Sequence, residues 1–133
     1  MNHLLCAIIG AVLVAPAAFA APLSAADLKG SYVLTTDLQP GVENQVTINE
    51  DGSYEFKEVV GNSGLDCTGE YILKKDMLIA HLECPVEDES YSFTQVLELD
   101  GLTKADLKKG AQAQAHSSLF GLANPVPVIL KKK

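Results

Sequence analysis

The residues best suited to nucleophilic chemistry are His116, Ser117 and Ser118, which bring a base and two hydroxyl groups together in the chain. A hydrolytic triad also needs an orienting carboxylate and amides that bind an oxyanion. Neither a nucleophile elbow nor a glycine-rich donor loop surrounds these residues. Beyond residue 20 the only other histidine is His81. We therefore expect a protein that is not an enzyme and has no catalytic residue.

His81 is also the centre of a candidate metal site. If a hairpin turns at residues 75–76, His81 faces Glu70 on the outer surface, with Glu83 and Thr68 adjacent. A histidine with two carboxylates is a ligand set that binds divalent metals. The same arrangement is typical of an exposed cross-strand charge pair, worth less than about 1 kcal/mol. We favour the charge pair and expect no metal and no cofactor. The acidic run 87–89 lacks the alternating spacing of a calcium loop.

A further set of side chains is suited to holding a small molecule. Six residues fall on one predicted inner face and combine rings with a few hydrogen-bonding groups: Tyr32, Tyr54, Tyr71, Tyr91, Phe93 and Gln95. Ligand pockets are commonly apolar, with a few polar groups that fix orientation. Tyrosine also favours strands for its shape alone, with its hydroxyl at a rim or on water. Both interpretations stay open.

The cysteines predict a covalent link between two strands. Cys6 lies in an N-terminal leader, which leaves Cys67 and Cys84, and an even number in an exported chain predicts a disulfide. A hairpin that turns at residues 75–76 sets these two cysteines opposite each other. They then occupy a non-hydrogen-bonded position, where Cα atoms approach to about 4.5 Å. We predict a structural bridge that takes no part in redox exchange.

Alternating apolar and polar residues, bounded by Gly, Asn, Asp and Pro, dominate the chain after the leader. They predict eight consecutive strands at 31–37, 44–49, 53–60, 67–74, 77–84, 90–99, 111–119 and 126–132. One segment, 103–109, is predicted to be helical. Thr103 can cap its start, Asp106 follows three residues later, and Gly110 can end it.

The turn at residues 49–52 sets the register of the first predicted hairpin. A three-residue loop, 50–52, pairs Ile48 with Tyr54 and Val46 with Phe56, so that all four side chains share one face. It also places Gly52 where the backbone needs a positive φ. In the second hairpin the turn at 75–76 pairs Leu73 with Leu78, Tyr71 with Ala80 and Gly69 with Leu82.

These registers define one apolar inner face. Its predicted members are Tyr32, Leu34, Val46, Ile48, Tyr54, Phe56, Gly69, Tyr71, Leu73, Leu78, Ala80, Leu82, Tyr91, Phe93, Leu97, Leu99, Ala111, Ala113, Ala115, Val126, Val128 and Leu130. Eight antiparallel strands with one apolar face need closure or a second sheet, and closure also removes the sheet edges. We predict an all-β, eight-stranded antiparallel up-and-down barrel with one short helix near the C-terminal third. Such an interior is filled by side chains or holds one small ligand.

The start of the first predicted strand, Asp27-Leu28-Lys29-Gly30-Ser31-Tyr32, resembles the Gly-x-Trp opening of the lipocalins and related calycin barrels, with Tyr32 in place of Trp. The eight-strand meander, the late helix and the final strand are also similar to that group. The resemblance implies a barrel that binds a small apolar molecule, with loops at the mouth setting specificity. Other small periplasmic barrels, including inhibitors of lysozymes and proteases, have a similar pattern.

The N-terminal segment predicts export. Residues 4–20 are uncharged and largely apolar, and they end in Ala18-Phe19-Ala20, the small-x-small pattern of a signal-peptidase site. We expect a signal peptide at 1–20, a single β-barrel domain at 21–133, and a periplasmic or secreted location without stable membrane insertion after cleavage. The 133 residues carry a net charge of −7 and no arginine, which argues against a nucleic-acid partner.

Three functions are compatible with this chain. The first is a binding protein for a small apolar or amphipathic ligand, and it requires an interior that is not solidly filled. The second is a protein-interaction domain, such as an inhibitor of an envelope or host hydrolase, acting through exposed loops at 37–43, 61–66 and 85–89. The third is a small hydrolase or isomerase, and it requires a cleft in which His116 or His81 contacts a carboxylate. We rank them in that order.

Overall fold

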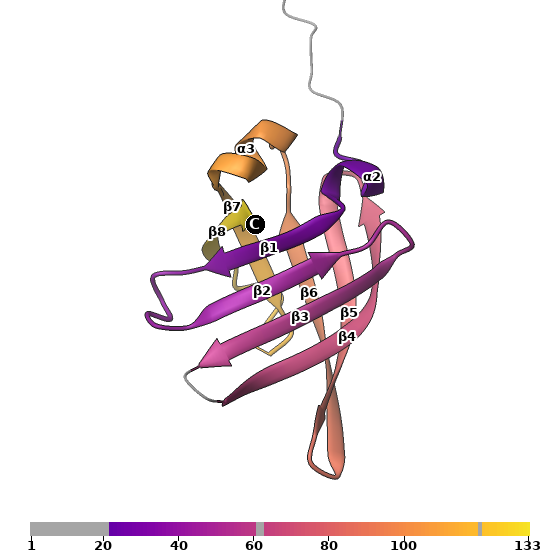
Figure 1. Ribbon diagram of the computed structural model, residues 1–133, viewed down its shortest axis with the longest axis vertical. Coiled ribbons are helices and arrows are strands. Elements are labelled where there is room, and N and C mark those ends of the chain that lie inside the picture. The colour runs from indigo at the N-terminus through magenta and orange to yellow at the C-terminus, as the bar shows by residue number, and fades with distance from the viewer. Residues whose placement is uncertain (1–21, 61–62, 120) are drawn as a thin grey trace, which may run out of the picture.

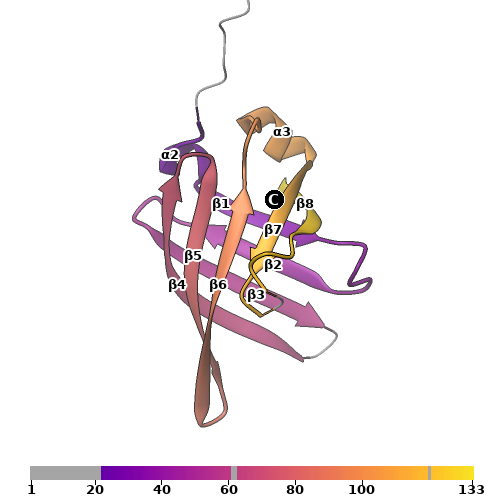
Figure 2. The same ribbon diagram turned by 180° about the vertical axis from the view of Figure 1, so that it is seen from behind.

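Each strand pairs with the next strand in the sequence, and the last pairs with the first, so the sheet closes into an eight-stranded antiparallel barrel (Figures 1 and 2). This computed structural model describes residues 22–60, 63–119 and 121–133, so the predicted signal peptide lies outside the described residues. The strands are β1 (Gly30–Thr35), β2 (Glu43–Ile48), β3 (Ser53–Val60), β4 (Ser63–Lys74), β5 (Met77–Val86), β6 (Glu89–Glu98), β7 (Ala111–Ser117) and β8 (Val126–Lys132). The predicted all-β up-and-down barrel is confirmed.

The registers derived from the turns are also confirmed. In the β2–β3 hairpin Ile48 pairs with Tyr54 and Val46 with Phe56, and Gly52 has a φ of +96°. In the β4–β5 hairpin the pairs are Leu73–Leu78, Tyr71–Ala80 and Gly69–Leu82. The turn between them places Lys75 at a φ of +56°, which is unusual for a residue with a side chain. The register therefore depends on the apolar faces more than on the turn residues.

Two of the three predicted loops are largely strand, and those predictions were wrong. The β3–β4 ladder continues to Val60–Ser63, so residues 63–66 belong to β4. The β5–β6 ladder continues to Val86–Glu89, which reduces the loop predicted at 85–89 to the two-residue turn 87–88. The β5–β6 hairpin consequently extends well beyond the rest of the barrel (Figures 1 and 2).

The predicted disulfide joins Cys67 and Cys84 at the point where β4 and β5 separate. Their Cα atoms are 4.3 Å apart, and the β4–β5 ladder ends one step earlier, at Thr68–Glu83. Beyond the bridge β4 pairs with β3 alone, and β5 pairs with β6 alone. The covalent link therefore closes a fork between two diverging hairpins.

Two short helices cover one end of the barrel (Figure 1). The helix α3 (Lys104–Lys109) is the predicted one, and Thr103 and Asp106 cap it reciprocally. The single-turn helix α2 (Ala25–Leu28) was not predicted, although Ser24 and Asp27 form the same capping box. An ion pair of 3.8 Å links Lys104 to Asp27. Within the described part of the chain, no helix is long and apolar enough to cross a membrane.

The interior is filled at the helical end. Leu28 of α2 and Leu107 of α3 are buried there and belong to the same apolar cluster as the inward side chains of the strands. Most of the predicted inner face is buried, whereas Gly69, Leu73, Tyr91, Ala115 and Val126 are partly exposed. One end of the barrel is therefore a packed core, and any ligand site must lie toward the other end.

Candidate ligand-binding cavity

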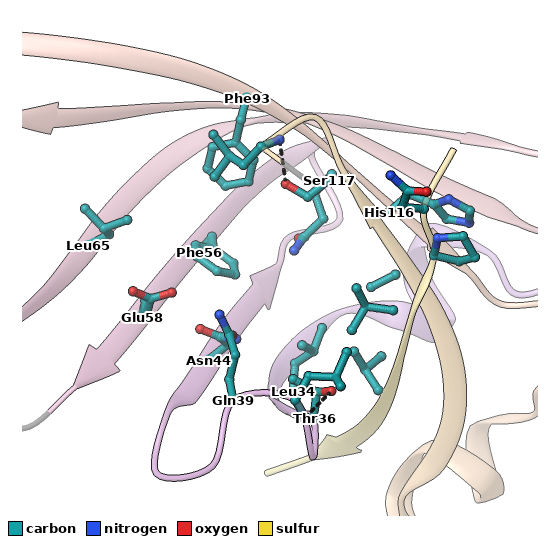
Figure 3. A pocket seen from close by; sticks show the side chains of 18 residues that line it. Leu34, Thr36, Gln39, Asn44, Phe56, Glu58, Leu65, Phe93, His116 and Ser117 are labelled. Carbon is teal, nitrogen blue, oxygen red and sulfur yellow. Dashed lines mark hydrogen bonds between the residues drawn. The ribbon is translucent and has the colours of Figure 1, made fainter. Parts of the chain in front are cut away.

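A cavity of about 500 Å³ occupies the end of the barrel opposite the helices (Figure 3). Its walls are mainly apolar side chains from five strands: Leu34, Phe56, Leu65, Phe93, Val126 and Val128. Phe56 and Phe93 meet edge to face, with ring centroids 5.7 Å apart. The volume falls within the range of about 300–1,000 Å³ that is typical of small-molecule pockets.

Gln95 and Tyr54 connect opposite sides of the barrel below this cavity. The Tyr54 hydroxyl donates a hydrogen bond to Gln95 Oε1, and both side chains are buried. Gln95 lines the cavity and Tyr54 does not. Tyr54 fills one acceptor position of Gln95 Oε1, and the Gln95 NH₂ group can donate to a ligand.

Asn44 and Glu58 are two further polar residues of the cavity wall. They pair directly across the β2–β3 ladder, and both line the cavity. Asn44 is only 7% exposed, and its Oδ1 is buried with no hydrogen-bond partner among the described residues. An unpaired buried carbonyl oxygen destabilises the folded protein by about 1–3 kcal/mol. A ligand that donates a hydrogen bond to Asn44 would remove this destabilisation.

Two loops form the mouth of the cavity. Thr36, Leu38 and Gln39 come from the β1–β2 connection, and Leu119 and Pro125 from the β7–β8 connection. Leu38 is 68% exposed and Leu119 is 52% exposed, so large apolar side chains face solvent at the entrance. Apolar groups left exposed at a groove are typical of binding surfaces.

His116 lies at the same mouth and contacts a carboxylate, as the hydrolase hypothesis required. Its Nε2 is 3.3 Å from Glu98 Oε2, and its Nδ1 is 2.7 Å from the Leu122 carbonyl oxygen. Both ring nitrogens therefore face acceptors. Ser117 Oγ accepts from the Leu119 amide and Ser118 Oγ from the Thr94 amide. Within the described part of the chain neither hydroxyl bonds to His116, so the nucleophile–base contact of a triad is not formed in this arrangement.

The six predicted ligand-contacting residues divide into two groups. Phe93 and Gln95 line the cavity, whereas Tyr32, Tyr54, Tyr71 and Tyr91 do not. The hydroxyl of Tyr32 donates to the Leu28 carbonyl and that of Tyr71 to the Asn49 carbonyl, both at 2.6 Å. The tyrosines share the predicted face but lie at other heights along the barrel.

Burial of these tyrosines should make the fold sensitive to alkali. Burial raises the pKa of Tyr32 from 10.0 to about 12. Because the folded value is above the unfolded one, stability present below pH 10 is lost as the pH rises toward 12. At pH 7 Tyr32→Phe should lower the free energy of unfolding by about 1 kcal/mol, because phenylalanine cannot donate the hydrogen bond to the Leu28 carbonyl. Between pH 9 and 11 the variant should lose less stability than the wild type, as urea unfolding measures. A pH-independent difference would contradict this.

The outer-face candidates lie where the register placed them. His81 pairs with Glu70 across β4 and β5, and its Nδ1 is 2.9 Å from Thr94 Oγ1 on β6. No group of three or more metal-binding side chains with suitable geometry occurs among the described residues. The acidic run 87–89 forms the tip of the β5–β6 hairpin.

Sequence reasoning missed Asn44, Glu58 and Leu65 as cavity residues. A signal for two of them was present, because extending the Ile48–Tyr54 register outward sets Asn44 opposite Glu58 on the inner face. Leu65 was assigned to a loop. Comparisons with protein-family models, curated proteins and solved structures found no match. The function must therefore be inferred from the cavity itself.

Proposed function

We propose that this protein is a non-enzymatic binding protein that holds a small apolar or amphipathic molecule in the open end of its barrel. The observation that carries the proposal is the apolar cavity of about 500 Å³ bounded by Phe56, Phe93 and Gln95. The packed helical end gives this cavity a floor, and the exposed leucines at the mouth give a ligand an apolar entrance.

The proposed location is the periplasm or the extracellular space. The Cys67–Cys84 disulfide indicates an oxidising compartment. The predicted signal peptide at residues 1–20 supplies the route. A carrier in such a compartment would take up ligands that are poorly soluble in water.

Filling the cavity tests the proposal. Ala115 lines it, and Ala115→Phe adds a ring inside, whereas Gln114→Phe adds the same ring on the outer face of the same strand. The wild type should bind the fluorescent apolar probe N-phenyl-1-naphthylamine. Ala115→Phe should weaken that binding by more than about tenfold, because the added ring takes the ligand's space. Gln114→Phe should bind as the wild type does.

Native mass spectrometry of protein from its exported fraction provides an independent measurement. A mass excess of a few hundred daltons that disappears on denaturation would identify a natural ligand. Equal probe binding by the wild type and Ala115→Phe would contradict a site inside the barrel.

The projecting β5–β6 hairpin favours a second candidate function, a protein-interaction domain. It extends beyond the barrel (Figure 2) and its exposed turn carries Glu87 and Asp88. This function predicts that shortening the hairpin abolishes binding to a partner while Ala115→Phe leaves it intact. The cavity carries the first proposal because a domain that acts only through loops has no need of a hollow interior.

A further inference from the structure

We propose that the ligand carries an uncharged hydrogen-bond donor, such as a hydroxyl group, at one end of an apolar body, and that a carboxylate is rejected. This inference rests on the proposed binding function and names the chemistry of its ligand. The residue that carries it is Asn44, whose side chain lines the cavity and is more than nine-tenths buried.

The unpaired Oδ1 of Asn44 can be satisfied by a ligand that carries a hydrogen-bond donor. Its Oδ1 is shielded from solvent and has no partner among the described residues. Carbonyl oxygens accept hydrogen bonds and cannot donate them. A buried water would need two to four polar partners, and most of the surrounding wall is apolar. A hydroxyl group on an apolar ligand donates to this oxygen, while the rest of the ligand contacts the apolar wall, so it does not need several polar partners.

Glu58 determines which head groups are excluded. It is the direct cross-strand neighbour of Asn44, and it also lines the cavity. A ligand carboxylate beside this side chain would meet a second acceptor of the same charge, and the repulsion would weaken its binding. An ammonium group could also donate to Asn44, but it would carry its charge into a cavity whose wall is mostly apolar, which costs more than burying a hydroxyl group. The hydroxyl group therefore matches this end of the cavity best.

The two ends of the cavity orient such a ligand. Asn44 lies at the start of β2, close to the β1–β2 loop of the mouth, while the rings of Phe56 and Phe93 lie further along the strands (Figure 3). The polar head therefore sits on the side wall near the entrance. The apolar body extends inward over the phenylalanine pair, toward the floor made by Gln95 and Tyr54.

Calorimetric titration with four eight-carbon probes tests the inference. 1-Octanol and heptyl methyl ether are isomers, and only the alcohol has a hydrogen-bond donor. Octanoate adds a negative charge and octylammonium a positive one. At pH 8 the wild type should bind 1-octanol about tenfold more tightly than the ether, since a buried hydrogen bond is gained and an unpaired oxygen is satisfied. Octanoate should bind more weakly than the ether.

Variants assign these preferences to residues. Asn44→Leu should bind both isomers equally and should have a higher melting temperature than the wild type, because an unpaired polar group is removed. Gln45→Leu changes the outward neighbour on the same strand and should keep the preference for the alcohol. Glu58→Gln should raise the affinity for octanoate by about tenfold.

The outcomes separate the two proposals. If neither neutral isomer binds, the proposed binding of small apolar molecules fails. If both bind equally to the wild type, or if Asn44→Leu keeps the preference for the alcohol, the binding function stands and the donor-headed ligand is wrong. If octylammonium binds more tightly than 1-octanol, Glu58 selects a cation and the uncharged head group is overturned.

Discussion

Replacing Cys67 and Cys84 together with alanine should lower the free energy of unfolding by about 3 kcal/mol. The bridge closes a loop with a sequence separation of 17 residues, and loop-closure entropy assigns about that value to a loop of this length. Both residues are fully buried, so the loss of packed sulfur atoms adds to the effect. Urea unfolding of the double variant beside the oxidised wild type measures the difference.

The position of the bridge determines where the variant should loosen first. Past Thr68 and Glu83 no ladder joins β4 to β5, so without the bridge the fork can advance into the barrel. Amide hydrogen exchange should therefore accelerate at these two residues before it does at the helical end. Reduced wild-type protein is the matched control and should lose a similar amount. A loss below about 1 kcal/mol would show that the strand ladders alone hold the fork closed.

Gly69→Ala should be still more damaging and should cost at least about 3 kcal/mol. A Cβ atom at Gly69 would overlap the carbonyl oxygen of His81 and lie 2.8 Å from its carbonyl carbon and 3.1 Å from Leu82 Cα. All of these are backbone atoms of the neighbouring strand, so no side-chain rotation relieves the clash. The change forces β4 and β5 apart next to the disulfide, as thermal unfolding would show.

Gly41→Ala is the comparison for this prediction. An added Cβ at Gly41 meets no atom within 4 Å, so the cost comes only from its φ of +81° and should be about 1 kcal/mol. If the two variants unfold at the same temperature, the close approach of β4 and β5 at Gly69 is not what requires glycine there.

The fold could be predicted because two short turns and one pair of cysteines fix the register. A shift of one residue at the 49–52 turn would have sent Tyr54 and Phe56 to the outer face, so the apolar pattern allowed one solution. The same reasoning failed at residues 63–66, which were predicted as part of a loop because glycine was interpreted as a loop signal. A Cβ at Gly64 would overlap the Glu58 carbonyl oxygen, so glycine there allows two strands to approach closely.

The site was less predictable than the fold. Alternation shows which face a side chain occupies, but it does not show its height along the barrel axis. That height depends on how far each tilted strand is staggered against the next. Tyr32 and Phe93 therefore share a face and lie in different places, one in the packed end and one on the cavity wall. Asn44 and Glu58 broke the apolar pattern and so fell outside a core defined by hydrophobicity.

The β5–β6 hairpin that leaves the barrel at the disulfide has a backbone edge that faces no other strand. Val86 and Glu89 flank the two-residue turn, so alternation in the ladder directs the amides of Val86 and Cys84 toward β6. The residue between them, whose amide would point to the open side, is Pro85, which has no N–H to offer. Glu87, Asp88 and Glu89 place like charges together when two such tips meet. On its β5 edge the hairpin can thus project from the barrel without templating strand-by-strand growth of one copy of the chain onto another.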